Sequence, residues 1–187
     1  MAQGSTLLGF EVTLSDVDRG VYESLSFKVA QHPSETAVYL VTRVLAYALE
    51  WAEGIELTAG LPTAEAPALA VRDRTGRLRT WIEVGTPDLS RLHRASKAAD
   101  RVAVYCHKNA EVWLRGLEGQ TVHAPESIAI VRLDAELVDA LAAAVQRRNT
   151  WSVSVTEGTL YVAVEGGADG EGEQTVVGSA QRLPWPA

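Results

Sequence analysis

The sequence is poor in the residues and runs that mark several large classes of protein. Its 187 residues include one cysteine, Cys106, so no internal disulfide can form and a disulfide-stapled secreted domain is excluded. No apolar run approaches the roughly 20 residues that a membrane-spanning helix needs. The first eight residues lack the basic and apolar regions of a secretory signal. We therefore expect a cytoplasmic protein with no membrane segment.

Basic residues are also in deficit, since 17 Lys and Arg stand against 24 Asp and Glu, a net charge of −7. This balance excludes indiscriminate coating of nucleic acid. The deficit is uneven, because residues 72–108 hold nine basic and four acidic residues, a local charge of +5, whereas the rest of the chain carries −12. The segment 72–108 is therefore the candidate for contact with a nucleic acid or an acidic protein surface.

Common catalytic and cofactor-binding motifs are missing as well. The sequence has no Gly-x-Ser-x-Gly, His-Glu-x-x-His or paired-cysteine motif, and its four histidines lack the spacing of metal ligands. The glycine-rich segment 166–172 carries acids and no lysine, which argues against a phosphate-binding loop. Residues 16–27 fail the EF-hand pattern, since Phe27 stands where a glutamate is required.

What the sequence does contain is a regular succession of strands and helices. One helix is predicted to begin at Ser34, just after Pro33, with Ser34 as its cap and Glu35 in its first turn. The order of elements predicts an α/β fold, a mixed sheet flanked by helices, in a single domain over residues 1–187. The hydrophobic pattern predicts these elements in chain order: strands 6–14 and 22–29, helix 34–52, strands 68–71 and 80–84, helix 88–99, strand 102–106, helix 109–116, strand 128–133, helix 135–146, and strands 151–156 and 160–164.

The candidate functional residues cluster in the centre of the chain. Glu83 lies near the end of one predicted strand, and Asp73 ends the strand before it in a hairpin. Arg91, Arg94 and Lys97 recur every three residues on the following helix, so they share one face as candidate phosphate contacts. Carboxylates beside cations suit phosphodiester chemistry, in which acids hold Mg²⁺ and cations position phosphate. The same pattern also fits a solvated basic helix with an ordinary salt-bridge partner.

At these residues the sequence resembles the YaeQ family of small bacterial proteins. The resemblance is carried by His-Pro-Ser-Glu-Thr at 32–36, Trp-Ile-Glu-Val-Gly-Thr-Pro-Asp at 81–88 and Lys-Ala at 97–98, and the flanking elements fit from about residue 6 to 185. It implies a fold related to the restriction-endonuclease-like PD-(D/E)XK superfamily, whose core is α-β-β-β-α-β. A short strand near 56–58 would complete that order, and N- and C-terminal strands would be added to this core.

The resemblance also implies roles for particular residues. Glu83 corresponds to the acid of the (D/E)-x-K element, but Gly85 stands where that element has lysine. Lys97, one helix further on, would serve as a lysine that has migrated onto the helix. Glu35 corresponds to the acid that the first helix of the superfamily often supplies.

The second metal-binding acid of such a site is missing from its usual place. Related sequences place it just after the proline of the strand before Glu83, and here that position is Ala68. Glu65 or Asp73 would have to substitute, or neither does. With Asp73, the metal ligands would be Glu83 and Asp73, and the metal would be Mg²⁺.

Two functions of different kinds remain open at this point. The first is a Mg²⁺-dependent nuclease that uses Glu83, Asp73 and Glu35 with Lys97 near the scissile phosphate. The second is a non-catalytic binding module with a nuclease-like fold that contacts nucleic acid or an acidic protein surface through residues 72–108. The sequence favours the second, because Ala68 and Gly85 occupy positions where a nuclease has reactive groups. It leaves open whether the protein is an enzyme, and in what oligomeric state it exists.

Overall fold

The computed structural model describes residues 4–58, 66–166 and 172–186. Within these ranges, ten strands join in one sheet in the order β2-β1-β8-β9-β10-β7-β6-β5-β4-β3, with four α-helices against it. The mixed α/β architecture predicted from the sequence is confirmed. The strands are β1 (Thr6–Asp16), β2 (Val21–Gln31), β3 (Ile55–Leu57), β4 (Leu69–Arg72), β5 (Leu78–Val84), β6 (Arg101–Cys106), β7 (Ile128–Leu133), β8 (Arg148–Thr156), β9 (Thr159–Glu165) and β10 (Glu173–Leu183). The helices are α1 (Ala37–Leu49), α2 (Leu89–Ala98), α3 (Ala110–Leu117) and α4 (Ala135–Ala144), with a 3₁₀ turn at Pro125–Ser127.

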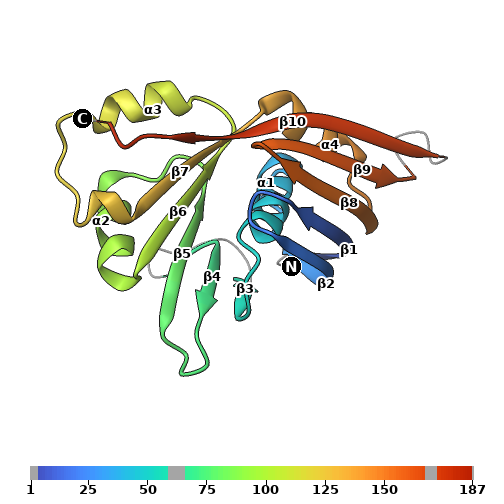
Figure 1. The fold of residues 1–187 in the computed structure, drawn as a ribbon, viewed down its shortest axis with the longest axis horizontal. Helices are drawn as coiled ribbons and strands as arrows, with labels where there is room; N and C mark the ends of the chain where they lie inside the picture. Colours follow the sequence, from blue (N-terminus) through green and yellow to red (C-terminus); the bar gives the residue numbers. More distant parts are fainter. Residues whose placement is uncertain (1–3, 59–65, 167–171, 187) are drawn as a thin grey trace.

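The sheet is sharply bent, and α1 lies between its two halves (Figure 1). The long strand β10 forms the bend, because residues 173–179 pair with β9 and residues 180–183 pair with β7. Strands β3 to β7 make one half, and β1, β2, β8 and β9 make the other. Helix α4 packs on α1 and β10 inside the bend, whereas α2 packs on β5 and β6 from the other side.

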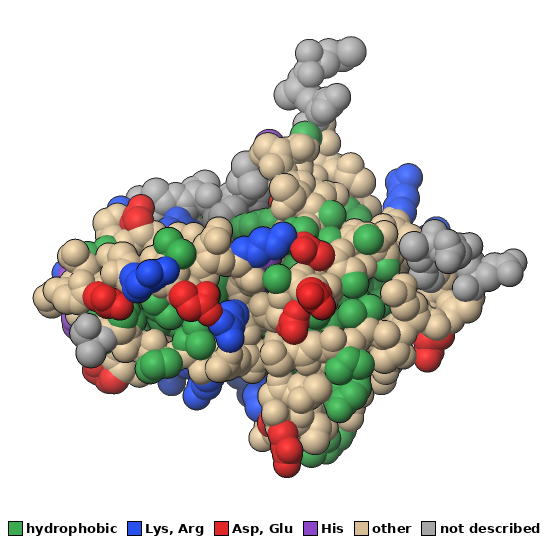
Figure 2. Space-filling view, turned by 90° about the horizontal axis from the view of Figure 1, so that it is seen from above, with side chains coloured by type: hydrophobic (Ala, Val, Ile, Leu, Met, Phe, Trp, Pro, Cys, Tyr) green, Lys and Arg blue, Asp and Glu red, His purple; other side chains and the backbone are tan. Residues whose placement is uncertain are grey.

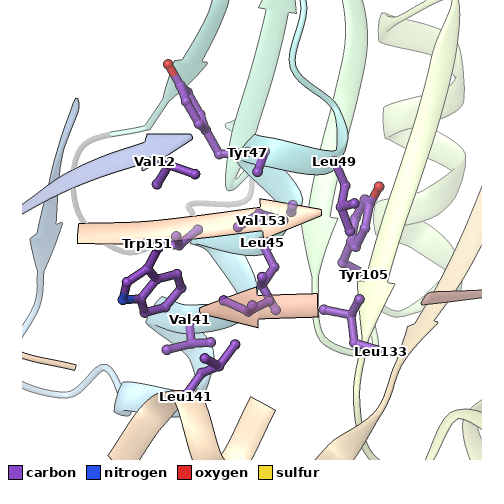
Figure 3. Close-up of a cluster of buried hydrophobic side chains, with 14 of the residues drawn as sticks. Val12, Val41, Leu45, Tyr47, Leu49, Tyr105, Leu133, Leu141, Trp151 and Val153 are labelled. Carbon is purple, nitrogen blue, oxygen red and sulfur yellow. The ribbon is translucent and has the colours of Figure 1, made fainter. Parts of the chain in front are cut away.

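Two hydrophobic cores result from this arrangement. The larger one lies inside the bend, where α1 has ten buried residues in its 13 and meets side chains from both halves of the sheet (Figure 3). Trp151 and Phe10 meet edge to face at its centre, with 5.2 Å between ring centroids. The smaller core lies between the outer face of β5–β7 and the helices α2 and α3, and contains Trp81, Leu92 and Val104. Because α1 is buried on nearly all sides, packing from several directions stabilises it, and not a single amphipathic face.

The start of α1 differs from the prediction. The capping residue is Thr36, whose Oγ1 accepts a hydrogen bond from the Tyr39 N–H at 3.1 Å, so the helix begins at Ala37. Ser34 therefore does not cap it, and Glu35 precedes the helix instead of lying in its first turn. The physical reason is that the buried Glu35 carboxylate binds an arginine and a preceding backbone N–H, as described below.

The sequence pattern also missed strand β10. Its side chains are mostly small or polar and largely exposed, so the strand carries little hydrophobic periodicity. Gly178 has a specific role there, because a Cβ at this position would lie 2.6 Å from the Leu137 Cβ of α4. The strand that bends the sheet thus has small residues because α4 approaches its backbone closely.

From α1 to β6 the order of elements is α-β-β-β-α-β, and the short strand expected near 56–58 is present as β3. Strands β5, β6 and β7 are parallel neighbours, and α2 is the crossover between β5 and β6. Consequently β5 ends where α2 begins, and residues at that junction lie at the carboxyl edge of the parallel strands. Glu83 is the second-last residue of β5.

Candidate functional site

A cleft of about 550 Å³ lies at the carboxyl end of β5, between the first turns of α1 and α2. Both helices present their N-terminal ends to it, which favours negative charge nearby. Three of the predicted site residues line the same cleft: Glu35, Glu83 and Arg91. The described residues around it are Ser34, Glu35, Thr36, Tyr39, Glu83, Val84, Thr86, Pro87 and Arg91.

The Glu83 carboxylate is buried, with the residue only 2% exposed, and it is held by two donors. Its Oε1 accepts hydrogen bonds from the indole N–H of Trp81 and from Arg91 Nε, the latter at 2.7 Å. The Arg91 guanidinium also lies over the Trp81 ring, 5.8 Å from its centroid. Burial raises the pKa of Glu83, although both hydrogen bonds and the Arg91 charge lower it. The carboxylate is therefore constrained, desolvated and already neutralised by a cation.

Arg91 is positioned by the start of α2 as well as by Glu83. The capping residue Asp88 accepts a hydrogen bond from the Arg91 backbone N–H at 2.8 Å, which fixes the backbone of the first turn. Arg91 Nη2 donates to the Ala66 carbonyl at 3.0 Å. The side chain thus joins α2 to the end of β5 and to the segment that precedes β4.

Glu35 is part of a second buried ion pair. Its Oε1 accepts a hydrogen bond from Arg43 Nη1 at 3.1 Å, and both side chains are 1% exposed. Its Oε2 accepts a hydrogen bond from the backbone N–H of His32 at 3.2 Å. Arg43 Nη1 and Nη2 also donate to the carbonyls of Ala30 and Thr58, at 3.3 and 2.8 Å. Glu35 therefore lies at the cleft, but its carboxylate is engaged in the core.

Tyr39 lies near both pairs and was not identified from the sequence. Its hydroxyl is buried and has no hydrogen-bond partner among the described residues. Burial raises the pKa of Tyr39 to about 12, with Arg43 opposing the rise and Glu83 adding to it. The hydrophobic pattern does not identify Tyr39 or Arg43, because both lie on the side of α1 away from the apolar stripe, a side that the pattern assigns to solvent. Arg43 is buried only because the tertiary fold brings Ala30 of β2 and Thr58 after β3 against that side.

Asp73 is not part of this cleft. It lies in the turn between β4 and β5, where its Oδ1 accepts hydrogen bonds from Thr75 Oγ1 at 2.6 Å and from the backbone N–H of Arg77 at 3.1 Å. The hydrogen bond from Thr75 is the main cause of its lowered pKa. Arg77 and Glu83 are separated by six residues of extended strand, about 20 Å. Since metal–oxygen bonds are about 2 to 2.6 Å long, Asp73 and Glu83 cannot share one ion.

The position opposite Glu83 carries no acid. Leu69 pairs with Ile82 in the antiparallel β4–β5 ladder, so one step further Ala68 faces Glu83. Glu65, the other candidate substitute, lies outside the described residues. In the part of the chain that the structure describes, no group of three or more His, Cys, Asp or Glu side chains is placed to hold a metal ion.

Lys97 lies at the far end of α2 from the cleft. It is exposed in the last turn of the helix, six residues and about 9 Å along the axis from Arg91. Arg94 is exposed one turn earlier. The structure therefore brings Arg91 to Glu83, but it places Lys97 beside the start of β6, away from the carboxylate.

The positive charge of segment 72–108 is largely matched by acids from elsewhere in the fold. On the face of the molecule that Figure 2 presents, basic and acidic side chains likewise lie beside one another. Arg77 and Arg79 share a single acid, Asp100. Further ion pairs of the segment among the described residues are Arg72–Glu56, Arg74–Glu53, Arg91–Glu83, Arg101–Glu50 and Lys108–Asp139. A local charge of +5 in the sequence is therefore not a surface of charge +5.

The fold and this site define a mixed α/β protein with a buried carboxylate–arginine pair at the end of a central parallel strand. The chain belongs to the YaeQ family, because the family model described as "YaeQ protein" matches residues 1–169. No helix in the described ranges has both the length and the apolar character to cross a membrane.

Relatives in sequence and in structure agree with this assignment. "Uncharacterized protein YaeQ" of Escherichia coli (strain K12) is 27% identical over 165 residues, 87% of this chain and 91% of that protein, and the Salmonella typhi protein of the same name is 25% identical over the same shares. The crystal structure of YaeQ protein from Xanthomonas axonopodis pv. citri superposes with a TM-score of 0.83 at 30% identity, covering 97% of this chain and 99% of that one. The crystal structure of YaeQ protein from Pseudomonas syringae gives 0.82 at 31% identity, covering 96% of each chain.

Proposed function

We propose that the protein is a non-catalytic binding module built on a nuclease-like scaffold. One observation carries this proposal: the Glu83 carboxylate is bound to Arg91 and Trp81, and the facing position is Ala68. A metal-dependent nuclease needs at least two carboxylates whose oxygens are free to coordinate. Here Arg91 binds Oε1 of Glu83, and the facing position has the methyl side chain of Ala68 where a second carboxylate would be needed.

The proposed relation to the restriction-endonuclease-like superfamily is supported by topology. The order α1-β3-β4-β5-α2-β6 is the α-β-β-β-α-β order that the resemblance implies. Glu83 occupies the expected place near the end of the third strand of that core. Strands β1 and β2 precede this unit, and β7 to β10 follow it, so the core would be enlarged at both ends.

The proposed contact surface is narrower than segment 72–108. It is the basic patch of Arg77, Arg79 and Lys97: Arg77 and Arg79 both pair with Asp100, which follows α2, and Lys97 lies in the last turn of that helix. All of these side chains are exposed or partly exposed, as a contact with a polyanion requires. The partner would be the phosphate backbone of a nucleic acid or an acidic protein surface.

We expect a fluorescein-labelled 20-base-pair DNA to bind with an affinity that falls steeply as NaCl rises from 50 to 300 mM, measured by fluorescence anisotropy. The double variant Arg79→Gln/Lys97→Gln should reduce the slope of log K against log[NaCl] by about 2, because each lost phosphate contact removes about 0.9. Glu83→Ala should leave the slope unchanged.

The matched control is Arg148→Gln, an exposed arginine on β8, outside the basic patch. An equal loss in this control, or binding that does not depend on salt, would contradict a directed contact. Binding of poly-glutamate in place of DNA, lost in the same double variant, would assign the patch to an acidic protein surface.

A Mg²⁺-dependent nuclease is the second candidate, and one observation favours it: Glu35 and Glu83 line the same cleft. The residues as they stand fit a metal poorly, since Arg43 and Arg91 bind these two carboxylates. If this function were correct, calorimetry would show saturable Mg²⁺ or Mn²⁺ binding that is lost in Glu83→Ala. We expect no binding heat up to about 10 mM metal, well beyond the affinity range of typical protein sites.

A further inference from the structure

A second cavity, of about 710 Å³, lies inside the bend of the sheet at the C-terminal end of α1. We call it the bend cavity. Strands β5, β6, β7 and β10 form its floor, on which Tyr105, Val131 and Arg182 make one row across three strands. The end of α1 and the β1–β2 turn form its wall. It is separate from the cleft that holds Glu83, which lies at the other end of α1.

The carboxylates in the bend cavity already have partners. Glu50 accepts hydrogen bonds from both Nη atoms of Arg101 and from the Tyr105 hydroxyl, the last at 2.8 Å. Asp16 accepts a hydrogen bond from Arg19 Nε at 2.6 Å and is 2% exposed. Both acids therefore form ion pairs that belong to the fold.

The third carboxylate of the lining and two carbonyls at the end of α1 also have donors. Asp18 accepts hydrogen bonds from the backbone N–H groups of Glu157 and Gly158 at 2.7 and 2.8 Å. The carbonyls of Ala48 and Trp51 at the end of α1 accept hydrogen bonds from the Arg19 guanidinium at 3.1 and 3.3 Å. These bonds leave no carboxylate in the cavity lining without a donor.

Arg182 differs from every other charged group in the lining. Its side chain is exposed, and its guanidinium makes no hydrogen bond or ion pair to any described residue. The guanidinium is a planar donor of up to five N–H groups that binds carboxylate and phosphate in two-pronged geometry. Among the charged groups of the lining, the unused hydrogen-bonding capacity is therefore that of a cationic donor.

We propose that the bend cavity binds a small organic anion. Its carboxylate or phosphate head group is bound by Arg182, and its apolar body lies against Leu49, Val131 and Val155. These three side chains line the cavity, and small-molecule sites are typically apolar with a few well-placed polar groups. An amine ligand would need a carboxylate without a partner, and the lining offers none among the described residues. The proposal is independent of the function assigned to Glu83 and to the basic patch.

Three probes that share one apolar body test this proposal on the full chain. Phenyl phosphate and phenylacetate carry the two candidate head groups, and benzyl alcohol is the uncharged control. Titrations up to 10 mM are followed by ¹⁵N–¹H NMR, and we expect at least one anion to shift the amides of Arg101, Gly158 and Ala180. The anion that binds more tightly identifies the head group.

Arg182→Gln should weaken the binding of that anion at least about tenfold, because a charge-assisted bidentate contact is lost. Arg148→Gln, an exposed arginine at the start of β8 and outside the cavity lining, should change it less than about twofold. The proposal is overturned if neither anion shifts these amides, if benzyl alcohol binds equally well, or if Arg182→Gln binds with unchanged affinity. Since Arg182 is exposed at a strand end, the variant should keep the wild-type spectrum elsewhere, which the same experiment checks.

Discussion

Replacing Arg43 with methionine should lower the free energy of unfolding by about 3–5 kcal/mol. Arg43 is 1% exposed, and its loss leaves the Glu35 carboxylate buried without a cation. Methionine fills a similar volume, so the effect reports the lost charge and hydrogen bonds more than a cavity. Urea unfolding at pH 7 measures it, and the m-value should stay constant if both states keep their exposed surface.

The expected effect is large because Arg43 connects parts of the fold that are far apart in the sheet order. Ala30 belongs to β2 and Thr58 follows β3, and these are the two edge strands of the ten-stranded sheet. Arg43 donates to the carbonyls of both from the middle of α1. It therefore closes the open side of the bent sheet against the helix, and no hydrophobic side chain can replace these hydrogen bonds.

The double variant Arg43→Met/Glu35→Gln is the matched control. Glutamine removes the uncompensated charge, so the double variant should recover about 2 kcal/mol relative to Arg43→Met alone. If Arg43→Met lowered stability by less than about 1 kcal/mol, the pair would not be a main support of the fold. Additive effects of the two substitutions would show that their side chains are not coupled.

The sequence predicted most helices and strands correctly because their hydrophobic patterns are strong and local. It failed where tertiary contacts override local pattern. Glu35 looks like a first-turn acid, but its ion pair with Arg43 holds it outside the helix and Thr36 caps instead. Strand β10 has small and polar residues because α4 packs closely on Gly178, a contact that no local pattern encodes.

The candidate site was also predicted only in part, because local sequence patterns indicate contacts between neighbouring elements and miss tertiary ones. Glu83 and Arg91 were both identified, because the end of a strand and the first turn of the next helix are necessarily close. The sequence predicts Asp73 at the site because it ends the neighbouring strand of a hairpin. The β4–β5 turn, which contains Asp73, lies at the opposite end of β5 from Glu83. Tyr39 comes from α1, and only the tertiary fold brings it to the cleft.

Charge counted along the chain was a poor guide to charge on the surface. The +5 segment and the −12 remainder attract each other in the fold, as in the pair of Arg101 with Glu50, which lies 51 positions earlier. Surface ion pairs contribute little stability, but they remove the field that a long-range polyanion contact would use. Among the described residues, Arg77 and Arg79 share the single acid Asp100, so a local excess of cations remains there.

The second large effect is expected at Arg91. Arg91→Gln should lower the free energy of unfolding by about 2–3 kcal/mol at pH 8, somewhat less than for a fully buried pair because the Arg91 side chain is 18% exposed. Near pH 5 the loss should be at most about half as large. The difference arises because Glu83 can be neutralised by a proton at the lower pH once its arginine is gone.

The direction of this pH dependence of stability follows from the raised pKa of Glu83. Its burial raises the folded-state pKa above the unfolded value, so the protonated form favours folding. That contribution is fully present below the unfolded pKa and is lost as pH rises through the folded pKa. In the wild type Arg91 lowers the pKa of Glu83, so less stability is lost as the pH rises. Without Arg91 the folded pKa rises further, and the decline in stability toward alkaline pH becomes steeper.

Glu83→Gln is the variant that isolates this ionisation. It removes the titrating group, so stability should depend less on pH between about 5 and 8, and at pH 8 it should equal or exceed that of the wild type. In this background Arg91→Gln should lower stability by less than about 1 kcal/mol. Equal losses for Arg91→Gln at both pH values would show that Arg91 acts through Ala66 and not through Glu83.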